Sequence, residues 1–269
     1  GATNYNSVTS FNARRRDSIR IAQAVERFYH GRYDLSPLIR RDQFRLIQLA
    51  LAEKNAEEIE KLEAGGFNGE IVVVDSEGPV FDEAVRWLKR QKVIGFDTES
   101  RPSFSPDQPH YGTSLLQLSG HNKAYLFRVN KTGLPYKLRN LLATPKIIKV
   151  GAAVADDVRG LQKIGGFDAR SFVDLQKIGW EYGIKDKSVK KMSAIILGIK
   201  ISKTQQLSNW EAESLSEAQK RYAATDAWVC REMYLRLMKS EKHPLTAEQL
   251  APNPPKQNKN NDKGNSQEG

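Results

Sequence analysis

The stretch VIGFDTES, residues 93–100, constrains the fold more than any other part of the sequence. Three of the four residues before Asp97 are bulky and apolar, which is typical of a buried strand. Asp97 and Glu99 are two residues apart, and strand side chains alternate between faces, so both carboxylates point to the same face. We therefore expect a strand over 93–97 with two like charges at its end, where they need neutralising partners.

Short apolar runs and helical patterns surround this stretch and predict one α/β domain over residues 69–240. A hairpin turn with Gly120 joins two early strands, whereas strands and helices alternate later. The sheet is therefore predicted to be mixed, with helices on both faces. The predicted strands are 70–74, 93–97, 115–118, 124–127, 147–150 and 171–173. The predicted helices are 82–90, 134–142 and 155–163, followed by a mostly helical remainder to residue 239.

Two segments flank this domain. Residues 1–68 are predicted to form a basic, partly disordered helical extension, because 18–63 has a helical apolar pattern that 1–18 lacks. The arginines of these helices either contact nucleic acid or form a solvated outer face, and the second interpretation is favoured. Residues 241–269 are predicted to be a disordered tail, since they are mostly polar and have no apolar anchor from Pro252 onward.

The formal net charge of +10 favours polyanionic partners such as nucleic acid, although ordinary surface lysines give the same balance. The one cysteine, Cys230, excludes an internal disulfide and a cysteine zinc cluster. No apolar run reaches the roughly 18 residues of a membrane span, and the first residues lack the apolar core of a secretory signal. We therefore expect a cytoplasmic protein that contacts no membrane.

Acids also collect at two later places. Asp156 and Asp157 lie in the first turn of a predicted helix, where both could serve the helix dipole and the free backbone amides. Tyr222 and Asp226 are four residues apart in a helical segment and therefore share a face. Taken alone, this second pair could be a plain structural hydrogen bond.

Together, the three places supply four acids and a tyrosine on regular elements, where side chains are held firmly. Clustered carboxylates repel one another unless protons or cations neutralise them, and ligand sets made only of oxygen select hard ions. We therefore expect Mg²⁺ or Mn²⁺ as the partner. Two such ions about 3.5–4 Å apart would stabilise the attacking and leaving oxygens of a phosphoryl transfer.

The order and spacing of these motifs resemble those of the DEDD 3′–5′ exonucleases, over about residues 69–239. FDTE at 96–99, the acid after VGAAV and YAATD at 222–226 carry the resemblance, and the tyrosine is typical of the DEDDy branch. SLLQLSG at 114–120 and AYLFRV at 124–129 also resemble ribonuclease D-like and Werner-syndrome-type exonuclease domains. The resemblance implies a ribonuclease H-like α/β fold. It also implies metal-dependent hydrolysis of DNA or RNA from a free 3′ end, releasing nucleoside 5′-monophosphates.

The resemblance further implies a role for each of five residues. A first metal ion would be held by Asp97, Glu99 and Asp226. Asp97 would bridge to a second ion, which Asp157 would reach through water. Tyr222 would orient the attacking water and help to deprotonate it.

Asp156 and Asp157 are adjacent, and only one of them is expected to face the site. The spacing from Val154 that Werner-type domains show selects Asp157. A helix turns by about 100° per residue, so Asp156 would then point away and face solvent or cap the helix.

Other polar and aromatic residues have simpler interpretations. Trp210 either stacks on a base or packs in the core, and core packing is favoured. Asp168 and Asp174 are expected to serve turns or a helix cap. A basic run could follow a phosphate backbone or form a solvated face. Its members are Lys185, Lys187, Lys190 and Lys191.

The alternative function is a catalytically inactive nucleic-acid-binding module that keeps the same fold. The presence of all five predicted site residues argues against it. A nucleotide phosphatase would share the metal ions but would not need a groove for a strand. The sequence leaves the choice between DNA and RNA open, and also the oligomeric state.

Overall fold

The structure is a computed structural model that describes residues 56–251, and its core is one mixed sheet. The strands are β1 (Glu70–Val74), β2 (Val93–Ser100), β3 (Thr113–Ser119), β4 (Lys123–Phe127), β5 (Ile148–Gly151) and β6 (Phe172–Asp174). Their order across the sheet is β1-β4-β3-β2-β5-β6. The pairs β2–β3 and β3–β4 are antiparallel, whereas β1–β4, β2–β5 and β5–β6 are parallel.

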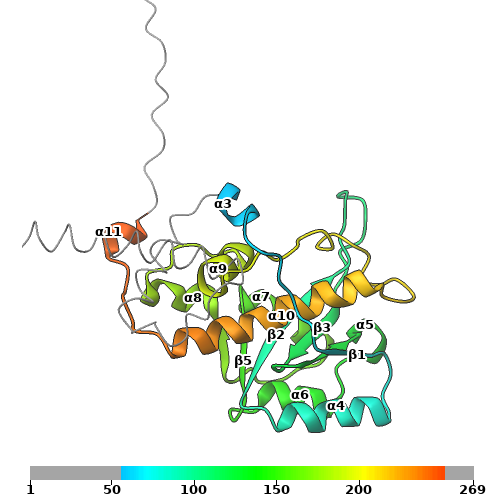
Figure 1. Ribbon diagram of the computed structural model, residues 1–269. Coiled ribbons are helices and arrows are strands. Elements are labelled where there is room, and N and C mark those ends of the chain that lie inside the picture. The colour runs from blue at the N-terminus through cyan, green and yellow to red at the C-terminus, as the bar shows by residue number, and fades with distance from the viewer. Residues whose placement is uncertain (1–55, 252–269) are drawn as a thin grey trace, which may run out of the picture.

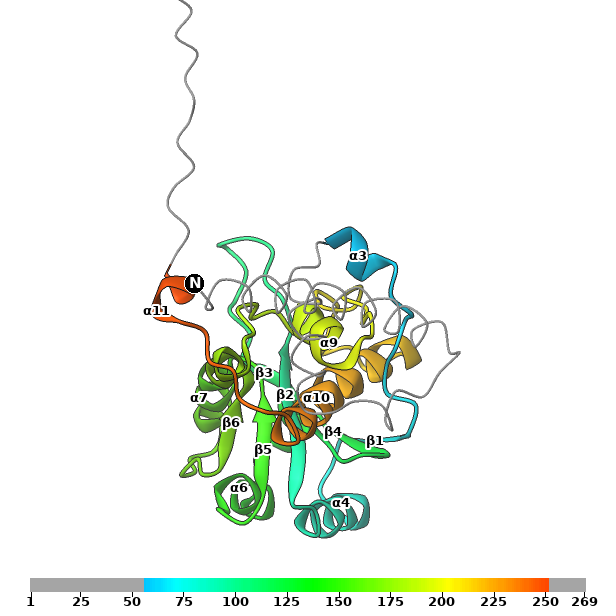
Figure 2. The ribbon, with the colours of Figure 1, turned by 60° about the vertical axis from the view of Figure 1, so that its left-hand side comes forward.

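Helices pack on both faces of this sheet, as the sequence predicts (Figure 1 and Figure 2). They are α3 (Ala56–Glu60), α4 (Pro79–Lys89), α5 (Val129–Thr132), α6 (Tyr136–Ala143), α7 (Val154–Ile164), α8 (Leu175–Ile178), α9 (Val189–Leu197), α10 (Glu217–Met238) and α11 (Ala247–Leu250), with a 3₁₀ turn η1 (Gly179–Tyr182). One apolar core joins α4, α6 and α7 to Ile94 and Phe96 of β2. Because side chains alternate along β2, Asp97 and Glu99 face α10 on the opposite side.

All six predicted strands and all three predicted helices are present among the described residues, with ends shifted by at most three residues. The difference at β2 matters for the site, because the strand continues to Ser100 and its acids lie within the strand rather than at its end. Pairing with β3 carries the strand past them, with Asp97 opposite Gln117 and Glu99 opposite Leu115. The remainder to residue 239 is mostly helical, as predicted, and residues 199–216 form turns and irregular backbone between α9 and α10.

The predictions for residues 1–55 and 252–269 lie outside the described residues. Residues 241–251, the start of the predicted tail, are described and contact the domain through their backbone. His243 donates a backbone hydrogen bond to Glu181 at 2.8 Å, Leu245 donates one to Trp180 at 2.9 Å, and α11 follows. Backbone bonds of this kind leave no apolar pattern in the sequence, so composition alone does not reveal them.

α10 packs directly against the backbone of β2. An added Cβ on Gly95 would lie 1.8 Å from the carbonyl oxygen of Ala227, so this position requires glycine. Ala223, Ala224 and Ala227 are fully buried, and their small side chains allow the close approach. The contact brings the neighbours of Ala227 on α10 next to the middle of β2.

We predict that Gly95→Ala destabilises the domain by at least about 2 kcal/mol, because the helix must move away from the strand. Gly112→Ala is the matched control, since an added Cβ there meets no described atom within 4 Å. Urea unfolding followed by circular dichroism measures both free energies of unfolding. Equal stabilities of the two variants would show that α10 and β2 tolerate a wider separation.

Candidate active site

Three carboxylates from two elements converge where β2 meets α10. The ligand oxygens of Asp97, Glu99 and Asp226 all lie within 4.8 Å of one another, and the three side chains are half-buried. Asp226 directly precedes Ala227, which approaches Gly95, so the backbone contact produces this convergence. The result is a cluster of oxygen ligands of the kind that binds hard divalent ions.

The cluster is unfavourable when its acids are ionised without a cation. Burial raises the pKa of Asp97, and the charges of Glu99 and Asp226 add to the shift. Burial, followed by repulsion from Asp226 and Asp157, raises the pKa of Glu99 to about 9. Burial also raises the pKa of Asp226 to about 7, although a hydrogen bond from Tyr222 opposes the shift. Protons or cations must compensate this repulsion, so the residues fit a divalent metal ion.

Asp157 approaches the cluster from α7, on the other face of β2. Its Oδ1 accepts a hydrogen bond of 2.7 Å from Oγ1 of Thr98, which lies between the two acids of β2. Burial raises the pKa of Asp157 to about 6, against the opposing effect of this bond. Asp156 points to solvent, with its side chain 86% exposed and paired with Arg159. Asp157 is therefore the member of the adjacent pair that faces the acids.

The first turn of α7 is fixed by Asp174, at the end of β6. The Asp174 carboxylate accepts the backbone N–H of Ala153 at 3.0 Å and that of Val154 at 3.2 Å. Ala153 is left-handed, with a φ of 56°, and these bonds offset the steric cost of that conformation. Asp174 also caps α8 by accepting the N–H of Gln176 at 3.0 Å, which confirms its predicted capping role.

Tyr222 lies one helical turn before Asp226, on the same face of α10. Burial, followed by the charges of Asp226 and Glu99, raises the pKa of Tyr222, so the phenol is neutral near pH 7. The ring of Trp210 packs against it, with centroids 5.9 Å apart and planes at 30°. Trp210 is fully buried, which confirms core packing and excludes it as a stacking surface for a base.

Gln117 of β3 is a neighbour of the acids to which the sequence assigned no role. It lies opposite Asp97, is fully buried, and donates from Nε2 to Oδ2 of Asp97 at 3.4 Å. Its Oε1 has no hydrogen-bond partner among residues 56–251. An unpaired buried oxygen beside three acids is what a hydrated metal site would satisfy. The available signal is the amide side chain of Gln117 between the leucines of SLLQLS.

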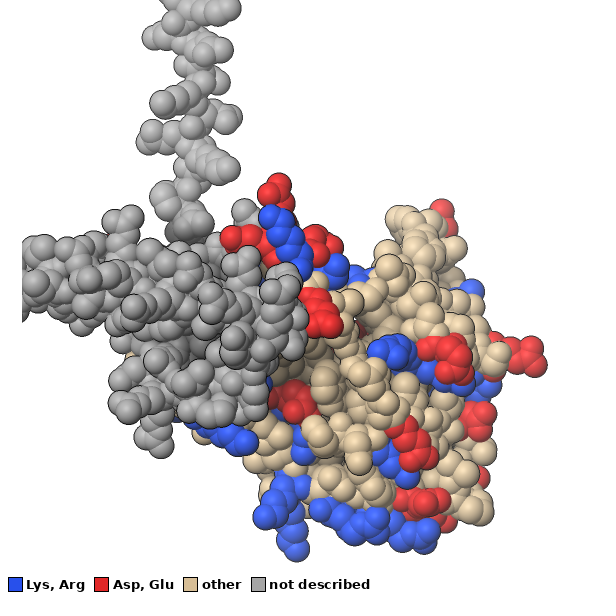
Figure 3. All heavy atoms as spheres, in the orientation of Figure 1, with Lys and Arg blue, Asp and Glu red and all other residues tan. Residues whose placement is uncertain are grey.

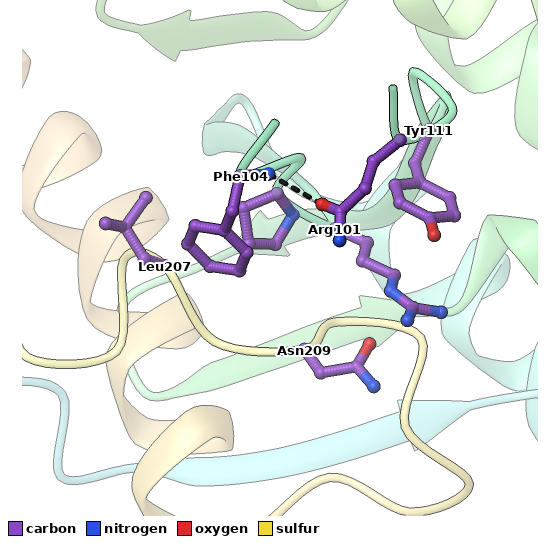
Figure 4. Close-up of a pocket in the computed structure, with 7 residues that line it drawn as sticks. Arg101, Phe104, Tyr111, Leu207 and Asn209 are labelled. Carbon is purple, nitrogen blue, oxygen red and sulfur yellow. Dashed lines mark hydrogen bonds between the residues drawn. The ribbon is translucent and has the colours of Figure 1, made fainter. Parts of the chain in front are cut away.

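Two cavities lie close to these residues. One, of about 210 Å³, is lined in part by Tyr222. The other, of about 130 Å³, lies between the loop after β2 and the loop before α10 (Figure 4). In this second cavity Phe104 and Leu207 are 71% and 66% exposed. The Arg101 guanidinium lies 4.6 Å from the centroid of the Tyr111 ring and 4.0 Å from the Glu211 carboxylate, so the cavity combines apolar surface with a charged pair.

Charged residues of both signs mix on the described part of the face seen in Figure 3. Within the predicted basic run, Lys190 pairs with Glu60 at 2.7 Å and Lys191 pairs with Asp186 at 3.6 Å. Local acids therefore neutralise half of this run. This favours a solvated face over a track for a phosphate backbone.

A family model described as 3′–5′ exonuclease matches residues 74–241. Exonuclease 3′-5′ domain-containing protein 2 of Drosophila melanogaster is 34% identical over 162 residues, which are 59% of this chain and 27% of that protein. Ribonuclease D of Gluconacetobacter diazotrophicus is 27% identical over 176 residues, which are 64% of this chain and 43% of that protein. The chain therefore spans less than half the length of these curated relatives.

Solved structures share the fold. The Nibbler EXO domain of Aedes aegypti aligns with a TM-score of 0.59 and 24% identity, over 65% of this chain and 92% of that domain. Escherichia coli RNase D aligns with a TM-score of 0.56 and 21% identity, over 64% of this chain and 44% of that chain. The fold is the ribonuclease H-like α/β fold that the sequence predicts. Within residues 56–251, no helix has both the length and the apolar character needed to cross a membrane.

We predict that Asp97→Asn raises the melting temperature of chelator-treated protein at pH 8, by about 2–4 °C, because it removes a disfavoured charge. The sign follows from the raised pKa of Asp97. The ionised carboxylate costs stability as the pH rises above its unfolded-state pKa of about 3.9, and the cost vanishes below that value. The gain should therefore shrink as the pH falls toward about 4, which calorimetry across this pH range measures.

Asp156→Asn removes the same charge from an exposed position and serves as the control. It should change the melting temperature by less than about 1 °C. Added Mg²⁺ or Mn²⁺ should stabilise the wild-type protein but not Asp97→Asn. A lower melting temperature for Asp97→Asn in chelator would contradict the repulsion between these acids.

Proposed function

The chain belongs to the 3′–5′ exonuclease family, and from this membership we propose that it hydrolyses nucleic acid from the 3′ end, releasing nucleoside 5′-monophosphates. The observation that carries the proposal is the convergence of Asp97, Glu99 and Asp226, with Tyr222 one turn away on α10. Strand and helix together offer metal ligands and a hydroxyl that can position water within one site.

Two divalent cations, Mg²⁺ or Mn²⁺, would suit the oxygen ligands of this site. One would be held by Asp97, Glu99 and Asp226. Asp97 and Asp157 would hold the other. When bound, the ions neutralise charge at the scissile phosphate and stabilise the departing 3′-oxygen. The hydrogen bond from Thr98 keeps the Asp157 carboxylate turned toward β2.

We assign to Tyr222 the orientation of the attacking water. Its raised pKa keeps the phenol protonated in the absence of metal ions, so the hydroxyl can donate a hydrogen bond. The help in deprotonation that the resemblance implies belongs to the same proposal. The packing of Trp210 on the ring supports a fixed direction for the hydroxyl.

We propose that the strand leading to the site runs along the cavity in Figure 4. Phe104 and Leu207 offer exposed apolar surface, and stacking on an aromatic ring tolerates any base. Arg101, two residues beyond Glu99, offers a guanidinium for a phosphate in competition with the Glu211 carboxylate, which lies 4.0 Å from it. A Trypanosoma brucei RNase D has been solved in complex with RNA U12, and RNA is therefore tested beside DNA.

We predict that single-stranded oligonucleotides with a 5′ label shorten stepwise in Mg²⁺ or Mn²⁺, whereas a 3′ label leaves first as a mononucleotide. DNA and RNA of one sequence are compared on gels, with excess chelator as control. Asp97→Ala should slow the reaction more than about 100-fold, since losing even an outer partner of a metal site costs about 10–100-fold. Cleavage that survives chelator or Asp97→Ala would refute the proposal. Binding without cleavage would indicate the catalytically inactive binding module.

Asp157→Ala is predicted to lose nearly all activity, because Asp157 faces Thr98 and the acids of β2. Asp156→Ala is the matched control and should keep activity within about 2-fold, since its side chain is 86% exposed. Initial rates on the same labelled oligonucleotide decide between them. The reverse order of rates would overturn this assignment.

A further inference from the structure

Arg128 follows β4 in the AYLFRV motif and is almost completely buried, with 2% of its surface exposed. Its guanidinium donates three hydrogen bonds to backbone carbonyl oxygens of one loop. Nη1 donates to Glu213 at 2.8 Å, and Nη2 donates to Trp210 at 3.4 Å and to Ala212. Arg128 therefore clamps residues 210–213 to the end of β4.

Burying this cation has a free-energy cost. Burial lowers the pKa of Arg128, and the charges of Asp75 and Glu211 oppose the shift. The loop over residues 199–216 has no regular secondary structure, and buried carbonyl groups need donors. A planar guanidinium with five N–H donors can hold several carbonyl groups at once. The hydrogen bonds that Arg128 donates therefore offset the cost of its burial. They hold a loop whose backbone lacks the regular hydrogen bonds of a helix or strand.

The clamped loop reaches the proposed site through Trp210. Trp210 is fully buried, and its ring packs on Tyr222 with centroids 5.9 Å apart. Its neighbour Glu211 accepts a hydrogen bond of 3.2 Å from Ser114 of β3, which ties the loop to the sheet a second time. The position of the Tyr222 ring thus depends on a loop whose carbonyl groups converge on Arg128.

We propose that Arg128 is a positioning residue for Tyr222, acting through Trp210 without touching substrate. The inference rests on the proposed function, in which Tyr222 orients the attacking water. Misplacing a catalytic group by about 1 Å costs about 100-fold in rate, so a loosened loop slows the chemical step. Arg128 lines neither of the two cavities near the site. The effect therefore falls on kcat more than on KM.

Arg128→Lys keeps the positive charge but replaces the planar fork with one nitrogen, which cannot occupy the two positions from which Nη1 and Nη2 donate. It is expected to lower kcat by about 10–100-fold while KM changes less than about 3-fold. In a Tyr222→Phe background the same substitution should lower kcat by less than about 2-fold, because the hydroxyl that it positions is already absent. A double-mutant cycle on single-turnover rates measures this coupling.

Arg139→Lys is the matched control. Arg139 also donates to backbone carbonyl groups, those of Leu134 at 3.0 Å and Gly166 at 3.4 Å, but in another part of the fold. It should leave kcat unchanged. Trp210→Phe is a second variant, in case Arg128→Lys folds poorly, and it should lower kcat without further loss in the Tyr222→Phe background. Additive losses in both cycles would overturn the proposal and make Arg128 a stabilising residue only.

Hydrogen exchange gives a readout that needs no activity. Arg128→Lys should speed amide exchange in residues 209–215 and in the first turns of α10, whereas Arg139→Lys should change neither. Unchanged exchange in these segments would also overturn the proposal. If the wild-type protein is inactive, the proposed function fails, and the exchange result alone decides whether Arg128 holds Trp210 and the turn that carries Tyr222.

Discussion

The contact between Gly95 and the backbone of Ala227 is the constraint on which the rest of the structure depends. Glycine on β2 and alanines on α10 remove the side chains that would otherwise hold helix and strand apart. The acid before Ala227 is thereby brought to the two acids that follow Gly95. A larger residue at this point would separate Asp226 from Asp97 and Glu99 even if the apolar packing on the two faces of the sheet survived.

This closeness has an electrostatic cost, because burial and mutual repulsion raise the pKa values of the clustered acids. Side chains in an unfavourable environment persist only where the surrounding structure holds them firmly in place. Here that place is the middle of the sheet, between apolar cores on its two faces. Cation binding would then stabilise the folded protein, because it would relieve the repulsion between the ionised acids. The same repulsion that opposes folding thus supplies the driving force for metal affinity.

Much of this architecture can be predicted from the sequence, because local patterns encode it. Apolar runs indicate the strands, and alternation along β2 puts Asp97 and Glu99 on one face. Contacts between distant segments have no local pattern. The hydrogen bond from Thr98 to Asp157 joins residues 59 apart, and that from Gln117 to Asp97 requires the β2–β3 register. The predicted end of β2 falls too early for the same reason, since pairing with β3 rather than apolarity carries the strand past its acids.

Two charged side chains, Asp174 and Arg128, form the hydrogen bonds that hold irregular backbone in place, as neighbouring strands hold one another in the sheet. Asp174 accepts N–H groups at the start of α7, where Ala153 is left-handed, and so fixes the helix that carries Asp157. Arg128 donates to carbonyl groups of the loop before α10 and so fixes the ring beside Tyr222. Each has the charge that the unsatisfied backbone groups require, an anion for N–H and a cation for C=O. The geometry of the site is therefore determined where its elements leave regular structure, by residues that never touch the three converging acids.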